Sequence, residues 1–174
     1  KNVMQAHPDT LFVLRAHPDE TRPGKTSLES VADWVASRKI EQMPNVYFVP
    51  SDRYFSSYEL IERSKFVLIY NSTIGLEASL LGAAVLCAGK ARFTQLPTVF
   101  FPATKNAYLE MLEQFLLSEK IEIPAEHRHH ARRFLYYQVF RTSLPFDRFL
   151  TEDGDWKGYV ALKPFDPQEL TPDH

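Results

Sequence analysis

Cysteine is almost absent from this chain, in which Cys87 is the single one among 174 residues. One cysteine excludes a disulfide within the chain and indicates a reducing compartment, where such a residue in an apolar run is most often a small core residue. Long apolar runs are also lacking. None approaches the roughly 18 residues of a transmembrane helix, so we expect no membrane span.

An excess of one charge is missing too. The formal net charge is -2, without the basic surplus that is typical of bulk nucleic-acid binding. The sequence contains no nucleophile elbow, no Walker loop and no paired cysteine motif. We therefore expect no nucleic-acid partner and none of the catalytic machinery that these motifs supply.

Histidine is concentrated in "EHRHHARR", residues 126–133, without the regular spacing of a metal site. We expect no metal and no tightly bound cofactor. The stretch is better explained as a solvated basic helix face, which can approach anionic lipid. These features together favour a cytoplasmic protein, and peripheral contact with the inner face of the membrane is left open.

Strand-like and helix-like segments alternate along the chain. A length of 174 residues, with 44% apolar and 24% charged residues, predicts one soluble domain with a core of its own. We expect strands at 10–18, 45–50, 65–70 and 83–89, an edge segment at 98–102, and helices at 26–39, 57–64, 73–82, 106–119 and 126–143. Such alternation is typical of α/β proteins, so we predict a Rossmann-like parallel sheet with helices on both faces.

Local signals support these boundaries. Thr26 with Glu29, and Ser56 with Glu59, have the spacing of capping boxes at helix starts. Gly82 can end the helix at 73–82. We expect residues 1–150 to form the α/β domain, followed by an irregular tail at 151–174 in which "GYVAL" is the single strand-like segment.

The stretch "VLIYNSTIGLEA" offers the first candidate for a site. A buried strand ends at Ser72 and Thr73, and a helix begins beside Gly75. Free amides and the dipole at a helix start attract an anion, and Gly75 would allow a phosphate or a backbone to approach closely. Glu77, one turn later, can hold a ribose or sugar hydroxyl. The alternative is that Ser72 or Thr73 merely caps the helix.

The stretch "RAHPDE" supplies a second wall. Arg15 and His17 lie at the exit of a strand, Pro18 fixes the turn, and Glu20 follows in the loop. An imidazole can donate a hydrogen bond to a phosphate or act as an acid or base. The alternative is that the histidine is an ordinary surface or core residue.

Two further loops complete the candidate site, because ligands bind beyond the carboxyl ends of parallel strands. Tyr54, Ser57 and Tyr58 follow the second strand and can stack on a base or bind it through hydrogen bonds, although packing is an alternative role. Lys90 and Arg92 follow the fourth strand and can meet a diphosphate, although solvated surface charges would look the same.

The order "LRAHPDE", "NVYFV", "SSYELIERSKFVLIYNSTIGLEASLLGAAVLCAGKA" resembles the C-terminal nucleotide-sugar-binding half of a GT-B glycosyltransferase. It is similar in particular to bacterial capsule and surface-polysaccharide biosynthesis proteins, including the Kdo-transferase-like and sialyltransferase-like groups with an "HP" motif. The similarity covers residues 10–102 and, more loosely, the helices up to residue 150.

This resemblance implies a transferase whose donor is a CMP-, UDP- or GDP-sugar. It implies that His17, Pro18, Ser72 and Thr73 bind the donor phosphate and that Glu77 lies near the ribose or sugar, so His17 and Glu77 are the candidate catalytic residues. The glycan or glycolipid acceptor would bind a further domain, and the chain alone would transfer nothing. A sugar-nucleotide 2-epimerase and a non-catalytic nucleotide-binding or assembly module remain alternatives.

Overall fold

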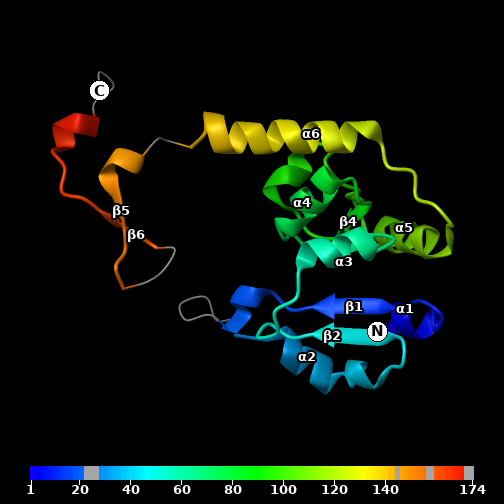
Figure 1. The fold of residues 1–174 in the computed structure, drawn as a ribbon. Helices are drawn as coiled ribbons and strands as arrows, with labels where there is room; N and C mark the ends of the chain where they lie inside the picture. The colour runs from blue at the N-terminus through cyan, green and yellow to red at the C-terminus, as the bar shows by residue number, and fades with distance from the viewer. Residues whose placement is uncertain (22–27, 144–145, 156–158, 171–174) are drawn as a thin grey trace.

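The structure is a computed structural model, and it describes residues 1–21, 28–143, 146–155 and 159–170. Strands and helices alternate in the first half, and two longer helices and a small hairpin follow (Figure 1). The helices are α1 (Asn2–Ala6), α2 (Val31–Ser37), α3 (Ser57–Arg63), α4 (Ile74–Leu81), α5 (Lys105–Leu117) and α6 (Ala125–Tyr136). The strands are β1 (Phe12–Arg15), β2 (Val46–Val49), β3 (Val67–Ile69), β4 (Val85–Cys87), β5 (Leu150–Glu152) and β6 (Val160–Leu162).

The predicted α/β class is confirmed, because parallel strand pairs alternate with helices. β1 pairs with β2, and β3 pairs with β4, both in parallel. Phe100 makes a single parallel bridge to Leu86 on the outer side of β4, within the predicted edge segment. One continuous sheet was expected, but in the described part of the chain the hydrogen-bonded ladders join these strands only two by two.

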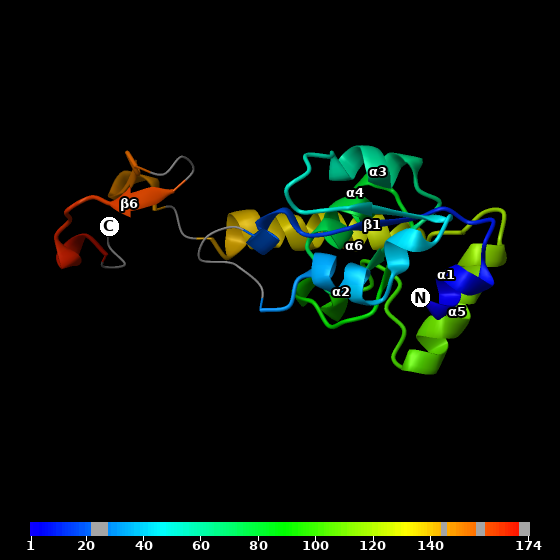
Figure 2. The same cartoon turned by 90° about the horizontal axis from the view of Figure 1, so that it is seen from below.

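Helices cover both faces of the strands. Seen from below, α3 lies on one side of β1 and α2 on the other (Figure 2). Two clusters of buried side chains hold the β3–β4 half together. One gathers around β3, β4 and α4 and includes Ile69, Ala78, Val85 and Cys87, and the other joins Ala84 and Leu86 to α5. Burial on both faces explains why these strands are continuous apolar runs.

Helix boundaries follow the capping residues. Ser56 begins α3 and its hydroxyl accepts a hydrogen bond from the Glu59 amide, as predicted. Gly82 ends α4 with a φ of 88°, a left-handed conformation that glycine adopts without strain. The predicted start of α2 is wrong, since the helix begins at Val31 with Ser30 as its cap. Thr26, the cap expected from the sequence, lies outside the described residues.

The C-terminal third differs from the prediction in two places. The helix expected at 126–143 is regular only to Tyr136 and continues as a π-helical turn, Tyr137–Arg141. The tail was expected to be irregular apart from one strand-like segment, but β5 and β6 pair as an antiparallel hairpin. A strand as short as β5 gives too little periodicity to be recognised.

None of the described helices is long and apolar enough to cross a membrane. The described residues also contain no group of three or more His, Cys, Asp or Glu side chains arranged to hold a metal ion.

We expect His127 to make a pH-dependent contribution to stability. The residue is 7% exposed on α6, and its ring packs edge-on against Phe100 with 4.8 Å between ring centroids. Burial lowers the pKa of His127 below 6.5, partly offset by the Glu126 charge. The unfolded chain therefore takes up a proton more readily than the folded chain, and stability should fall as the pH drops below about 6.5.

A comparison of urea unfolding at pH 7.5 and pH 5.0 checks this. We expect His127→Gln to lose less unfolding free energy between these two pH values than the unmodified chain. His129→Gln, at an exposed position on the same helix, is the control and should lose as much as the unmodified chain. Equal losses for all three proteins would contradict the assignment.

Candidate functional site

The first turn of α3 connects the carboxyl ends of the two strand pairs. Arg15, the last residue of β1, donates hydrogen bonds to the Ser57 hydroxyl and, at 2.8 Å, to the Phe55 carbonyl. The Tyr58 hydroxyl donates to the Glu77 carboxylate on the first turn of α4. Since α4 directly follows β3, the exits of β1 and β3 lie at the same edge of the molecule. This is where the sequence places the site.

His17 is oriented by its own turn. Its ring is exposed, and the Nδ1 atom accepts a hydrogen bond from the Asp19 amide at 3.1 Å. A neutral ring held in this way carries its proton on Nε2. Within the described ranges no other group engages Nε2, so this N–H remains able to donate to a ligand.

The Glu20 side chain is engaged by the start of α2. It is 6% exposed, and its carboxylate accepts a 2.6 Å hydrogen bond from the Val31 amide at the start of α2. A carboxylate at a helix start satisfies a free amide and complements the dipole. The 3-10 turn that begins at Pro18 therefore buries the Glu20 side chain, whereas the His17 side chain stays at the surface.

The start of α4 has no side-chain cap. The amides of Gly75 and Leu76 are satisfied by the carbonyls of Ser72 and Thr73. Neither hydroxyl of these two residues makes a hydrogen bond within the part of the chain that the structure describes, and the amides of Thr73 and Ile74 have no acceptor there. Two hydroxyls and two amides are thus available at one helix start, which is the composition of an anion site.

Gly75 is needed for packing. A Cβ atom at this position would lie 2.1 Å from Ile69 Cδ1 and 3.4 Å from Val85 Cγ1. The glycine thus lets α4 approach β3 closely. The sequence analysis gave two possible reasons for a glycine here, the approach of a phosphate and the approach of a neighbouring backbone. The contact with β3 is of the second kind.

The remaining predicted residues differ in exposure. Lys90 and Arg92 are exposed beyond β4 and, among the described residues, form no ion pair. Tyr54 is 94% exposed, whereas Tyr58 is committed to Glu77. Tyr70, which directly follows β3, was not among the predicted residues and is 72% exposed.

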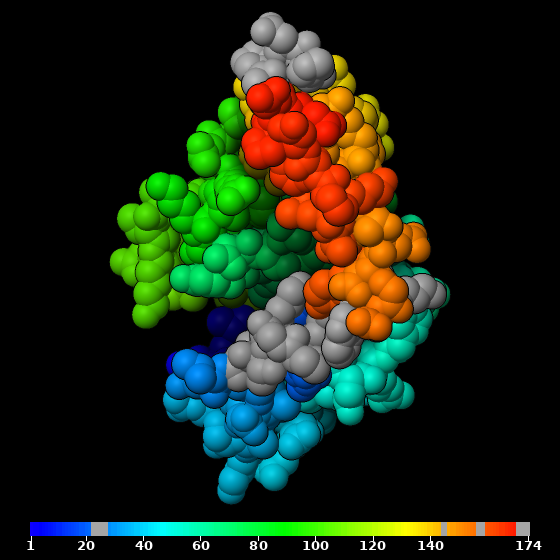
Figure 3. Space-filling view, turned by 90° about the vertical axis from the view of Figure 1, so that its left-hand side faces the viewer, coloured from blue at the N-terminus to red at the C-terminus, as the bar shows by residue number. Residues whose placement is uncertain are grey.

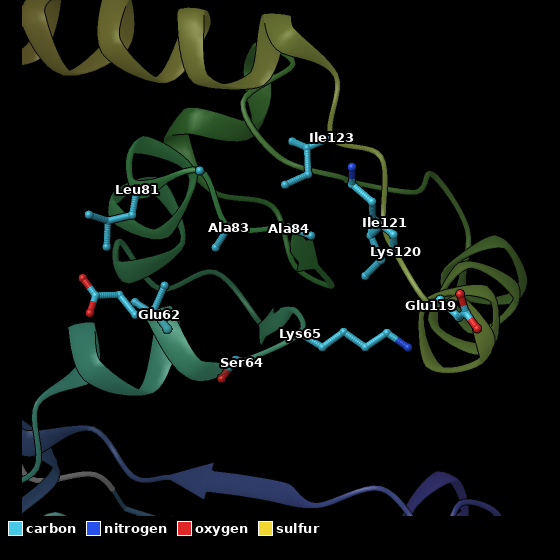
Figure 4. A pocket seen from close by; sticks show the side chains of 12 residues that line it. Glu62, Ser64, Lys65, Leu81, Ala83, Ala84, Glu119, Lys120, Ile121 and Ile123 are labelled. Carbon is cyan, nitrogen blue, oxygen red and sulfur yellow. The ribbon is translucent and has the colours of Figure 1, made fainter.

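A cavity lies elsewhere in the described part of the chain. It has a volume of about 470 Å³ and is bordered by the end of α3, residues 81–84 and residues 119–123 (Figure 4). Lys65 and Ala84 precede β3 and β4, so this cavity opens at the amino ends of the strands. It lies at the opposite edge from His17 and Ser72, and we do not assign the predicted site to it.

A double-mutant cycle tests the role of Gly75. Gly75→Ala should destabilise the fold by about 1–3 kcal/mol, because the added methyl group collides with the buried Ile69 side chain. Ile69→Val removes the colliding methyl group and should cost about 0.5–1.5 kcal/mol by itself. The double variant should be more stable than the sum of the two losses predicts, as measured by urea unfolding. Strict additivity would rule out the collision.

The hydrogen bond between Tyr58 and Glu77 has a titration signature. The bond and the carboxylate charge raise the pKa of Tyr58 above 10.0. The stabilisation is fully present below pH 10 and is lost as the pH rises through the raised pKa. Ultraviolet titration of Tyr58, taken as the difference from Tyr58→Phe, should show this pKa falling in Glu77→Gln. An unchanged pKa would show that the contact is not formed in solution.

A comparison with known protein families finds a match for the first part of the chain. A family described as capsule polysaccharide biosynthesis protein matches residues 1–97, which include β1 to β4 and every predicted site residue. No curated protein and no solved structure matches the chain. The matched segment is more than half of the 174 residues. The chain therefore belongs to the capsule polysaccharide biosynthesis protein family.

Proposed function

We propose that this chain is the donor-binding part of a glycosyltransferase that binds a nucleotide-activated sugar for capsule polysaccharide synthesis. The observation that carries the proposal is the uncapped start of α4, where the Ser72 and Thr73 hydroxyls and the amides of Thr73 and Ile74 are available. A diphosphate satisfies these donors and the helix dipole together. Membership of the capsule family supplies the biological setting.

The residues at this edge take different roles in the proposal. Nε2–H of His17 donates to a phosphate oxygen, and Lys90 and Arg92 neutralise further charge on the diphosphate. Arg15 positions the loop at 55–57, because two of its guanidinium nitrogens are already committed there. Glu77 faces the ribose or sugar, and Tyr58 orients it.

The chemistry that these groups support is departure of a nucleotide. Negative charge grows on the leaving phosphate as the sugar bond breaks, and prearranged donors and cations stabilise that charge. The acceptor and the base that activates it would belong to a further domain. Transfer itself is therefore expected only when both parts are present.

The epimerase alternative is weaker in this geometry. Proton abstraction would need several carboxylates around the sugar. Glu20 is committed to the Val31 amide, and Glu77 accepts the Tyr58 hydrogen bond. The non-catalytic alternative predicts that no nucleotide binds at this edge, which the following experiment examines.

Thermal-shift and calorimetric titration with CMP, UDP, GDP and their sugars tests the proposal. One nucleotide, at 100 times its dissociation constant, should stabilise the chain by about 2.7 kcal/mol. His17→Ala and Ser72→Ala should each weaken its binding about ten- to hundredfold, because each removes a hydrogen bond to a charged group. His129→Ala, at an exposed histidine on α6, is the control and should bind normally. Unchanged affinity in both site variants would refute the assignment.

A further inference from the structure

The cavity at the amino ends of β3 and β4 lies apart from the proposed donor site. Its volume, about 470 Å³, is in the range of pockets that hold small molecules. The end of α3, the end of α4 and the segment after α5 border it. The hairpin of β5 and β6 (orange to red) lies in front of the opposite edge, at the carboxyl ends of β1 and β2, which faces the viewer in Figure 3. The hairpin therefore does not cover the cavity.

The middle of the cavity is apolar. Ile61 and Ala84 are buried, and Ala83, Ile121 and Ile123 are half-buried around them. In Figure 4 the two alanines lie between the charged side chains at the two ends of the cavity. Because alanine side chains are short, this part has room for the aliphatic body of a ligand. The polar groups at the two ends then decide which ligand fits.

Two helices end at the cavity with free backbone carbonyls. The amides of Ser64 and Gly82, the residues that cap α3 and α4, donate back to the preceding turn of each helix. The carbonyls of Glu62 and Leu81, one or two residues earlier, receive no hydrogen bond from any of the described residues. Free carbonyls at a helix end carry partial negative charge and favour a cation.

The end of α5 shows how this fold satisfies such a helix end. Lys65 Nζ donates a 2.9 Å hydrogen bond to the Leu116 carbonyl, so an ammonium group already lies at the carboxyl end of α5. The Lys65 side chain extends towards α5 and away from Glu62 (Figure 4). α3 and α4 lack such a partner, because no lysine, arginine or histidine of the described ranges bonds to the carbonyls of Glu62 or Leu81.

The side chains add negative charge at the same place. Glu62 is exposed and forms no ion pair with a described residue, and Figure 4 shows its carboxylate on the side of the cavity where Leu81 lies. Lys65 is committed to α5, and Glu119 and Lys120 follow α5 on the other side, where their charges oppose each other. The Glu62 side thus combines a carboxylate with the end of α4, which carries about half a negative charge. A cation is favoured there.

We infer that this cavity binds a small organic cation, namely a primary ammonium group on a short aliphatic chain. The ammonium group has three N–H donors, and it donates to the Glu62 carboxylate and to the backbone carbonyls of Glu62 and Leu81. The aliphatic chain lies against Ala83 and Ala84. The site is at the opposite edge from Ser72, so the inference is independent of the proposed function.

Three probes of nearly the same shape test the inference by magnetic resonance of the backbone amides of the full chain. Butylammonium, 1-butanol and butyrate are positive, neutral and negative at pH 7. Butylammonium should shift the signals of Lys65 and Ala84 and bind about tenfold more tightly than 1-butanol, because its hydrogen bonds are charge-assisted. Butyrate should leave these signals unchanged. No response to butylammonium, an equal response to all three, or a stronger response to butyrate would overturn the inference.

Variants then test the position of the ammonium group. Glu62→Gln keeps the shape of the side chain but removes its charge, and it should weaken butylammonium binding about tenfold. Ala83→Val narrows the cavity without a change of charge and should weaken binding as well. Glu59→Gln, at an exposed position in the first turn of α3, is the matched control and should bind normally. Unchanged affinity in either cavity variant, or an equal loss in Glu59→Gln, would overturn the inference.

Discussion

The first turn of α3 is the contact on which the arrangement of the site depends. It bonds backward to Arg15 at the end of β1 and forward, through Tyr58, to Glu77 on α4. Without this turn, the exits of the two strand pairs would have no polar connection at that edge among the described residues. Charge-assisted bonds of this kind are stronger than neutral ones, so these three can fix the position of a short helix. Arg15 Nε is nevertheless buried without a hydrogen-bond partner among the described residues. Leaving this donor unsatisfied costs free energy, which the two bonds of the same guanidinium must offset.

Two kinds of polar group lie at this edge, those bonded within the fold and those left without a partner among the described residues. Glu20 and Ser57 satisfy bonds that the fold itself needs. His17 Nε2, the hydroxyls of Ser72 and Thr73, and the charges of Lys90 and Arg92 are left over after those needs are met. The leftover groups are donors or cations, so the edge is suited to an anion. Glu77 is the exception, and its hydrogen bond from Tyr58 holds it in place beside them.

The sequence predicted those helix ends that depend only on neighbouring residues. Ser56 and Gly82 were identified because a cap and a left-handed helix end each require particular residues. The start of α2 was missed because Ser30, only four residues after Thr26, caps a helix equally well. Parallel pairing of the strands could be predicted, but their separation into two pairs depends on contacts between residues distant in the sequence.

The sequence could predict at which edge of the sheet the site residues lie, but not which partners their side chains contact. That residues after β1, β3 and β4 would share an edge follows from parallel topology. The commitment of Glu20 to the Val31 amide, and the contact of Gly75 with Ile69, depend on side-chain directions that spacing alone does not give.

Nuclear magnetic resonance of the backbone amides during titration with pyrophosphate examines the central claim most directly, because pyrophosphate offers the charge without a base or a sugar. The signals of Thr73 and Ile74 should shift first and furthest, together with the His17 ring, while the amides around the cavity at Lys65 and Ala84 stay unchanged. Shifts confined to the cavity or to α6, with Thr73 and Ile74 unaffected, would contradict an anion site at the start of α4.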